Sequence, residues 1–145
     1  LEKISFKIYE DERIYPKVRI PKVKKNTFMF AGRLTKEKGI LEIIDWCIKN
    51  NKKLLIYGYG SLENKIKIIS SMNDNINYFG PYKSFFSLGE YGTLIFNSLY
   101  EGTPNIIYEA IHLKIPIICR LYDDCVQDEF DSYNKITFFN DINEI

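Results

Sequence analysis

Short apolar runs alternate with segments of helical character along most of this chain, and that alternation is the feature that most restricts its fold. The runs occupy residues 28–31, 54–57, 76–79, 93–96, 117–120 and 136–139. The segments predicted to be helical are 40–48, 61–71, 83–91, 105–113 and 125–132. Strands that alternate with helices favour parallel pairing, with helices on both faces of the sheet. The sequence therefore predicts an α/β fold with a doubly wound, Rossmann-like parallel sheet.

Length and composition indicate one domain. A chain of 145 residues with 46% hydrophobic residues can bury a core. We expect the domain to span 26–145 and to be truncated at its C-terminus, because residues 141–145 resemble the start of a helix. Residues 1–25 are basic and interrupted by prolines, so we expect a linker or an N-terminal extension there. No apolar run reaches the roughly 20 residues of a membrane-spanning helix.

Charge is distributed unevenly along the chain. Residues 1–60 contain 14 lysines and arginines against 7 acidic residues, whereas 61–145 contain 6 against 12. A basic first half can attract phosphates or an anionic membrane surface, and it can equally be a solvated linker beside one phosphate pocket. We therefore expect a cytoplasmic protein for which peripheral contact with the inner face of a membrane stays open.

The three cysteines do not form a metal-ligand or redox spacing. Cys47, Cys119 and Cys125 each lie within or beside an apolar run. We expect them to be reduced packing residues, as is typical of a cytosolic protein.

Two strand-to-helix turns carry the residues that most restrict function. The first follows the run 28–31 and contains Gly32, Arg33, Lys38 and Gly39. Arginine presents a planar fork to phosphate oxygens, and lysine presents a mobile point charge. Taken alone, this turn fits either a phosphate-binding loop or an ordinary loop with basic residues.

The second turn follows the run 93–96 and opens a helix. Thr103 can cap that helix, and Pro104 suits its first turn, where a missing N–H costs nothing. The N–H groups of Asn105 and Ile106 are then free to face an anion, with help from the helix dipole.

Two glutamates flank the start of this helix. Glu101 precedes it, and Glu109 lies more than one turn inside it. A carboxylate repels a diphosphate, so each glutamate is predicted to accept hydrogen bonds from hydroxyls, one from a ribose and the other from a transferred sugar. The alternative is a pair of surface glutamates on an ordinary capped helix. Because parallel strands bind ligands at their carboxyl ends, the two turns together predict a site for a nucleotide with a diphosphate and a sugar.

Other motifs are weak. Gly58-Tyr59-Gly60 begins like a dinucleotide fingerprint but lacks the third glycine, so a tight strand-to-helix turn is the better interpretation. Walker A and Asp-x-Asp patterns do not occur, and we predict neither a bound metal nor a separate cofactor. His112, the single histidine, is interpreted as a packing or surface residue rather than a base.

The order of these turns resembles a known family. The series runs through 30–34, Lys38-Gly39, 56–60, 78–80, Ser98, 101–105 and Glu109-Ala110. It is similar to the C-terminal, donor-binding domain of the retaining GT-B glycosyltransferases of family four, the glycosyl transferases group 1 domain. The similarity extends from about Thr27 to Arg120.

This resemblance implies specific roles. Arg33 and Lys38 would hold the donor diphosphate and stabilise the departing negative charge, while Glu109 would bind the ribose hydroxyls. Glu101 would contact and orient the donor sugar, and it joins Arg33 and Lys38 as a catalytic candidate. The loop around Gly80 and Tyr82 would border the base. The implied donor-binding set is Gly32, Arg33, Lys38, Gly80, Tyr82, Glu101, Gly102, Thr103, Pro104, Asn105, Ile106 and Glu109.

The resemblance also implies partners and a reaction. The family transfers a sugar from a nucleoside diphosphate to an acceptor with retention of anomeric configuration, usually without a bound metal. We therefore expect a hexose donor, a glycan or lipid-linked acceptor, and a separate N-terminal acceptor domain, without which this chain is expected to be inactive. Nucleic acid is not an expected partner.

The sequence departs from the family pattern after the second helix. Lys114 and Ile115 precede Pro116 where the family commonly has a glycine, and residues 121–125 lack the usual glycine-rich loop. The resemblance therefore does not define the distal wall of the sugar pocket. Two rival functions stay open: a non-catalytic sugar-nucleotide sensor or interaction domain of the same fold, and a phosphate-binding α/β domain such as a flavodoxin-like regulator.

Overall fold

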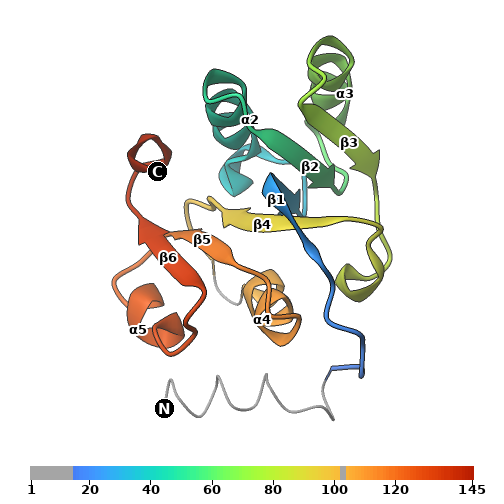
Figure 1. Ribbon diagram of the computed structural model, residues 1–145. Coiled ribbons are helices and arrows are strands. Elements are labelled where there is room, and N and C mark those ends of the chain that lie inside the picture. Colours follow the sequence, from blue (N-terminus) through green and yellow to red (C-terminus); the bar gives the residue numbers. More distant parts are fainter. Residues whose placement is uncertain (1–14, 102–103) are drawn as a thin grey trace.

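The protein folds around one six-stranded, all-parallel sheet. A computed structural model describes residues 15–101 and 104–145. The strand order is β3-β2-β1-β4-β5-β6 (Figure 1). The strands are β1 (Val23–Ala31), β2 (Lys53–Tyr57), β3 (Ile76–Gly80), β4 (Tyr91–Phe96), β5 (Ile117–Arg120) and β6 (Ile136–Phe139). The predicted doubly wound parallel sheet is confirmed.

Helices cover both faces of this sheet. They are α2 (Ile40–Lys49), α3 (Glu63–Met72), α4 (Asn105–His112) and α5 (Val126–Phe130). In Figure 1, α2 and α3 lie on one side of the sheet, and α4 and α5 lie on the other. Short 3-10 turns complete the fold: η1 (Lys36–Lys38), η2 (Phe85–Ser87) and η3 (Ile142–Glu144). Among the described residues, no helix is long and apolar enough to cross a membrane.

Alternation along the strands gives the protein two hydrophobic cores. Phe30, Leu54 and Ile56 pack with buried residues of α2 and α3. Met29 and Leu55 point to the opposite face and pack with residues of α4 and α5. Successive strand residues point to opposite faces, so one apolar run supplies both cores. This explains why the strands read as continuous apolar runs.

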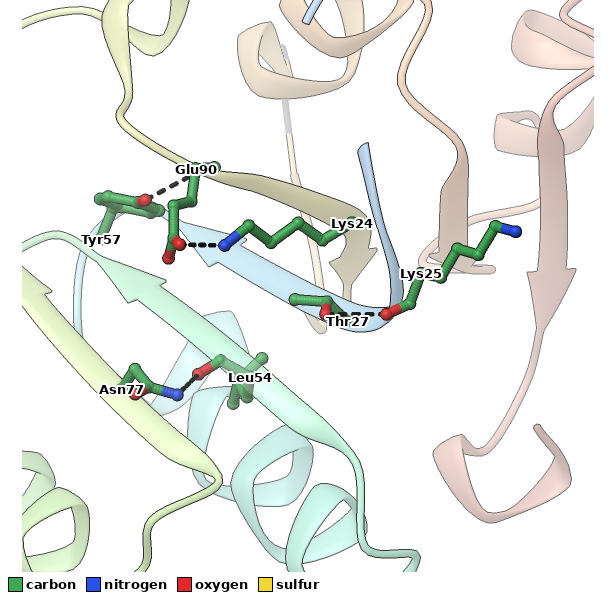
Figure 2. A network of polar contacts seen from close by, with 7 residues as sticks. All are labelled: Lys24, Lys25, Thr27, Leu54, Tyr57, Asn77 and Glu90. Carbon is green, nitrogen blue, oxygen red and sulfur yellow. Dashed lines mark hydrogen bonds and ion pairs between the residues drawn. The ribbon is translucent and has the colours of Figure 1, made fainter. Parts of the chain in front are cut away.

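A polar network ties the first strand to the segment that enters β4. Lys24 forms an ion pair with Glu90, and the Tyr57 hydroxyl donates a hydrogen bond to the Glu90 carbonyl oxygen at 2.9 Å (Figure 2). Tyr57 ends β2, so three segments meet at Glu90. The contacts hold the entry of β4 against β1 and β2.

The predicted helix at 83–91 is wrong. Only the 3-10 turn Phe85–Ser87 forms there, and β4 already begins at Tyr91. Ser84 caps this single turn by accepting from the Phe86 N–H at 3.1 Å. The Tyr91 hydroxyl then donates to the Phe85 carbonyl at 2.5 Å and accepts from the Leu88 N–H at 3.1 Å. Because the side chains of Ser84 and Tyr91 pair with the backbone of this turn, its N–H and C=O groups do not need a longer helix to be satisfied.

Two predicted helix starts differ from the structure. The helix predicted at 61–71 begins at Glu63, after the N-cap residue Leu62, and no side-chain cap bond is made there. Pro104 occupies the N-cap of α4 rather than its first turn. The predicted cap Thr103, together with Gly102, lies outside the described residues.

The cysteines divide between core and surface. Cys47 and Cys119 are buried, as expected of packing residues, and burial raises the pKa of the Cys47 thiol to about 12. Cys125 is exposed, so its expected packing role is wrong. Its apolar neighbour Val126 is the residue that enters the core.

Candidate functional site

The candidate site lies between the carboxyl ends of β1 and β4. These two strands are neighbours in the sheet, but the chain leaves β1 toward β2 and leaves β4 toward β5, on opposite sides. Their ends therefore form the point where the strand order reverses. A pocket of about 260 Å³ opens there. Its lining comes from both strand ends, both following turns and the start of α4.

Most of the predicted site residues meet at this pocket. Its lining includes Gly32, Arg33, Lys38, Tyr82, Glu101, Pro104, Asn105, Ile106 and Glu109. Gly80 is not among the lining residues, and its carbonyl oxygen instead accepts a hydrogen bond from the Gly58 N–H at 2.8 Å. Gly102 and Thr103 were also predicted, but they lie outside the described residues. Residues from four separate stretches of sequence thus converge on one pocket.

Lys38 and Glu101 link the two turns by charge. Lys38 Nζ forms an ion pair with Glu101 Oε1, which also accepts a hydrogen bond from Ser98 Oγ at 3.0 Å. The Glu101 side chain is only 12% exposed and that of Lys38 30%. A partly buried pair is screened less by salt than a surface pair. The carboxylate is therefore held in place from two sides.

Asn97 is a buried polar residue of the site that sequence reasoning did not single out. Its Nδ2 donates to the Gly39 carbonyl oxygen at 3.1 Å, and it is only 2% exposed. A Cβ on Gly39 would lie 2.4 Å from the Asn97 backbone oxygen, so the contact requires glycine. The available signal was an asparagine directly after a buried apolar strand, because a polar residue in that position needs a partner.

A backbone hydrogen bond joins the same two turns. The Leu99 N–H donates to the Glu37 carbonyl oxygen at 3.0 Å. Together with the Asn97 contact and the ion pair, it fixes the turn after β1 against the turn after β4. The pocket wall formed by Lys38 and Glu101 is therefore held in position by the backbone on either side.

The glycines at the end of β2 form a tight turn behind Arg33. The Leu34 N–H donates to the Tyr59 carbonyl at 2.9 Å, and the Leu62 N–H donates to the Leu34 carbonyl at 2.9 Å. A Cβ on Gly60 would come within 2.7 Å of the Leu34 oxygen. The interpretation of 58–60 as a tight turn is confirmed.

Arg33 lies at the junction of two hollows. The side chain is exposed, and Arg33 lines the main pocket and also a neighbouring hollow of about 260 Å³. Gly32 and Tyr82 line both hollows as well, and Tyr59 lines the second. A ligand with a charged centre and groups on either side would place that centre at Arg33.

Glu109 and Tyr82 both line the pocket. Burial raises the pKa of the Glu109 carboxyl above its ordinary value. The pKa of Tyr82 is also raised, first by burial and then by the charge of Glu109. A buried carboxylate needs hydrogen-bond donors, because leaving it unpaired is costly. Glu109 is thus suited to accept hydrogen bonds from a ligand.

Two large side chains lie near the site at the end of β5 and in the segment after it, Arg120 and Tyr122. Arg120 donates to Asn97 Oδ1 at 3.4 Å, and the Tyr122 ring packs against Phe96 with centroids 5.8 Å apart. The pKa of Tyr122 is raised, first by burial, with Glu101 among the smaller charge contributions. Arg120 and Tyr122 therefore contact residues at the end of β4, Asn97 and Phe96, which line the pocket.

His112 lies away from the pocket. Its Nε2 is 3.1 Å from the Pro16 carbonyl oxygen, and its ring lies 5.1 Å from that of Tyr15. It packs the segment before β1 against the end of α4. These contacts agree with the packing role that was one of the two expected for His112.

The sheet order and the position of the pocket define a class of protein. They are those of doubly wound α/β domains that bind a ligand at the reversal of strand order. The sequence pattern of the glycosyl transferases group 1 family matches residues 11–133. Since this match covers most of the chain, the protein belongs to that family.

Relatives agree with this assignment. The chain is 35% identical over 105 residues to the uncharacterized glycosyltransferase MJ1059 of Methanocaldococcus jannaschii, and the match covers 65% of this chain and 26% of that protein. The chain therefore spans about a quarter of that relative.

Solved structures show the same fold. The chain resembles TarM at 25% identity with a TM-score of 0.66, over 88% of this chain and 29% of TarM. It resembles the lipopolysaccharide outer core galactosyltransferase WaaB at 23% identity with a TM-score of 0.62, over 79% of this chain and 38% of WaaB. The pneumococcal O-GlcNAc transferase GtfA, solved with UDP and GlcNAc, matches at 22% identity with a TM-score of 0.58, over 82% of this chain and 28% of GtfA. In fold, the chain matches the C-terminal half of GT-B glycosyltransferases.

Proposed function

We propose that this chain binds the nucleoside-diphosphate sugar of a retaining glycosyltransferase, which transfers a hexose to a glycan or lipid-linked acceptor. The observation that carries the proposal is the convergence of Arg33, Lys38, Glu101 and Glu109 on one pocket at the reversal of strand order. Two cations and two carboxylates suit a ligand that has both phosphates and hydroxyl groups. The proposal gives each of these residues a separate part of the donor.

The diphosphate would lie between Arg33 and Lys38. Arg33 is exposed at the junction of the two hollows, where its guanidinium can bind two phosphate oxygens. The start of α4 lines the same pocket through Asn105 and Ile106, so the positive end of the helix dipole faces the anion. These groups are positioned before the ligand arrives, so they need little rearrangement to stabilise its charge.

The hydroxyl groups of the donor would be bound by the glutamates. Glu109 lies in the wall toward Tyr82 and would accept from the ribose diol, which places the base in the hollow that Tyr59 and Tyr82 line. Glu101 lies on the β4 side and would accept from the transferred sugar. Tyr122, in the segment that stands in place of the usual glycine-rich loop, would lie beside that sugar.

The chemistry requires one bond to break and one to form. The bond between the anomeric carbon and the β-phosphate oxygen breaks, and its electron pair stays on the nucleoside diphosphate. The acceptor hydroxyl oxygen bonds to the anomeric carbon, and its proton passes to the departing diphosphate oxygen. Arg33 and Lys38 would favour this step by stabilising the charge on the departing diphosphate, as electrostatic catalysis requires.

The reaction would need more than this chain. Because the chain spans only 26% of its archaeal relative and 29% of TarM, we propose that an N-terminal domain binds the acceptor and completes the cleft. We also propose that the donor binds without a metal ion and that the reaction takes place in the cytoplasm. The basic segment before β1 would be available for contact with an anionic membrane surface.

Calorimetric titration with UDP and with GDP, first without metal and then with magnesium, tests this proposal. We expect one nucleotide to bind without metal, and we expect Arg33→Ala and Glu109→Ala each to weaken binding by about tenfold or more. Arg19→Ala is the matched control, because it removes an exposed arginine outside the pocket. Binding that both pocket variants leave unchanged would contradict the proposal.

A further inference from the structure

One oxygen of Glu101 receives both of its bonds from the protein. Lys38 Nζ and Ser98 Oγ both contact Oε1. Among the residues that the structure describes, Oε2 receives no hydrogen bond. Within the described part of the chain, the carboxylate thus binds a lysine with one oxygen and leaves the second to accept from a ligand.

The surroundings keep Glu101 in this position. Ser98 is buried at 2% exposure, so its hydroxyl is a fixed donor. The turn that carries Lys38 is fastened on both sides of that residue, through the Glu37 carbonyl and the Gly39 carbonyl. A diphosphate that binds Lys38 therefore meets a carboxylate that cannot swing away.

This arrangement affects the two forms of the nucleotide differently. A nucleoside diphosphate without sugar has to share Lys38 with Glu101, so its negative charge and that of the carboxylate meet at one lysine. An intact sugar nucleotide brings hydroxyl groups, which can donate to the second oxygen of the same carboxylate. The unfavourable charge contact is offset only when the sugar is present.

On the basis of the donor-binding function above, we propose that Glu101 sets the preference of the site for the intact donor over the spent nucleoside diphosphate. It acts through Lys38, whose charge it shares with the diphosphate. After transfer the sugar hydroxyls are gone, so the same carboxylate weakens the hold on the product and favours its release. Glu101 is therefore a positioning and selectivity residue in addition to its contact with the sugar.

Glu101→Gln tests this directly. The variant keeps a side-chain oxygen that can accept from Lys38 and Ser98, but it removes the charge. We expect UDP or GDP, whichever binds, to bind about tenfold more tightly to the variant, which is the scale of one charge contact in a partly exposed site. UDP-glucose, UDP-N-acetylglucosamine and GDP-mannose are titrated alongside, and a donor that binds should gain less or lose affinity. The ratio of donor affinity to product affinity therefore falls.

Two further variants separate charge from structure. Glu42→Gln removes a negative charge in the first turn of α2, outside the pocket, and should leave both affinities unchanged. In a Lys38→Met background, Glu101→Gln should increase the affinity for the nucleoside diphosphate by a smaller factor. Much of the increase in the wild-type background comes from Lys38, which no longer shares its charge with Glu101. A carboxylate with only a structural role would change both affinities by the same factor, and thermal unfolding of each variant checks that it is folded.

The outcomes distinguish this inference from the proposed function. If Arg33→Ala weakens binding but Glu101→Gln leaves the affinity for the nucleoside diphosphate unchanged or lower, the inference is overturned and the donor site stands. If neither nucleotide binds to the unmodified chain or to Glu101→Gln, the donor site itself is contradicted. Tighter product binding with a smaller change for the donor supports both.

Discussion

Gly58 and the carbonyl oxygen of Gly32 are so close that a Cβ on residue 58 would lie 1.8 Å from that oxygen. The contact joins the turn after β2 to the turn after β1, directly behind Arg33. The Gly32 N–H donates to the Tyr57 carbonyl at 3.1 Å, so the two turns are bonded as well as packed. The position of Arg33 therefore depends on Gly58, which also lines the hollow beside Arg33.

Gly58→Ala should destabilise the fold by about 3 kcal/mol or more, because the new methyl group meets backbone atoms and φ is +144°. Gly89→Ala is the matched control, since open space surrounds that Cβ position. Chemical denaturation measures both free energies of unfolding. Equal stability of the two variants would show that the turns are free to move apart.

Lys114→Gly should stabilise the protein by about 1 kcal/mol. Lys114 follows α4 with φ +58°, a left-handed conformation that glycine adopts without strain. The helix ends in a Schellman motif, in which the Ile115 N–H bonds to the Ala110 carbonyl at 3.0 Å and the Lys114 N–H bonds to the Ile111 carbonyl at 3.0 Å. Denaturation midpoints measure the effect.

Asn51→Gly is the control for that prediction. Asn51 also has a positive φ, +52°, but asparagine tolerates the left-handed region better than lysine does. Asn51→Gly should therefore stabilise the protein less than Lys114→Gly does. A loss of stability in Lys114→Gly would mean that unfolded-chain entropy outweighs the relief of strain at this position.

Glu109→Gln should change the pH dependence of stability. Burial raises the pKa of Glu109, so the folded state holds this proton more tightly than the unfolded state does. The wild-type chain thus loses stability as the pH rises from the ordinary glutamate value through the raised one. Glu109→Gln should be more stable than the wild type at neutral pH, and the difference should disappear in acid.

Glu90→Gln should change the stability at neutral pH in the opposite direction. The pKa of Glu90 is lowered, chiefly by the hydrogen bond from Lys24, so its charged form adds stability that is lost as the pH falls through the lowered value. Glu90→Gln should be less stable than the wild type at neutral pH. Thermal unfolding of both variants between pH 3 and 8 measures this, and two differences of the same sign would contradict the account of Glu109.

Asn97→Ala should cost about 1–3 kcal/mol, because it leaves the buried Gly39 carbonyl without its partner. It should also weaken nucleotide binding, since the turn that carries Lys38 loses one of its attachments. Asn64→Ala, on the exposed surface of α3, serves as the control. Unchanged stability together with unchanged nucleotide affinity would show that Asn97 does not position the site.

The sequence predicted the sheet and most of the pocket because both depend on local patterns. Every apolar run became a strand, and the glycine-bounded turns after β1 and β4 met where parallel strands end. Gly80 was expected at the site because the resemblance places it, with Tyr82, in the loop that borders the base. It instead bonds to Gly58, a contact between two turns that sequence order does not reveal.

The features that the sequence did not predict depend on contacts between distant residues. The 83–91 segment was expected to be a helix, but Tyr91 satisfies the turn at Phe85 from the next strand. Asn97 acts through Gly39, which lies 58 residues away in the chain. Such pairs become visible only when the strands are placed side by side.

The most direct test of the donor site is to locate a nucleotide by NMR, by following backbone amide resonances during titration with UDP and with GDP in the absence of metal. The account predicts that one nucleotide shifts the amides of Gly32, Arg33, Asn105 and Ile106, and that magnesium adds little. Shifts centred on the separate hollow beside Leu99 and Tyr100, or no shift at Arg33 and Asn105 with either nucleotide, would contradict it.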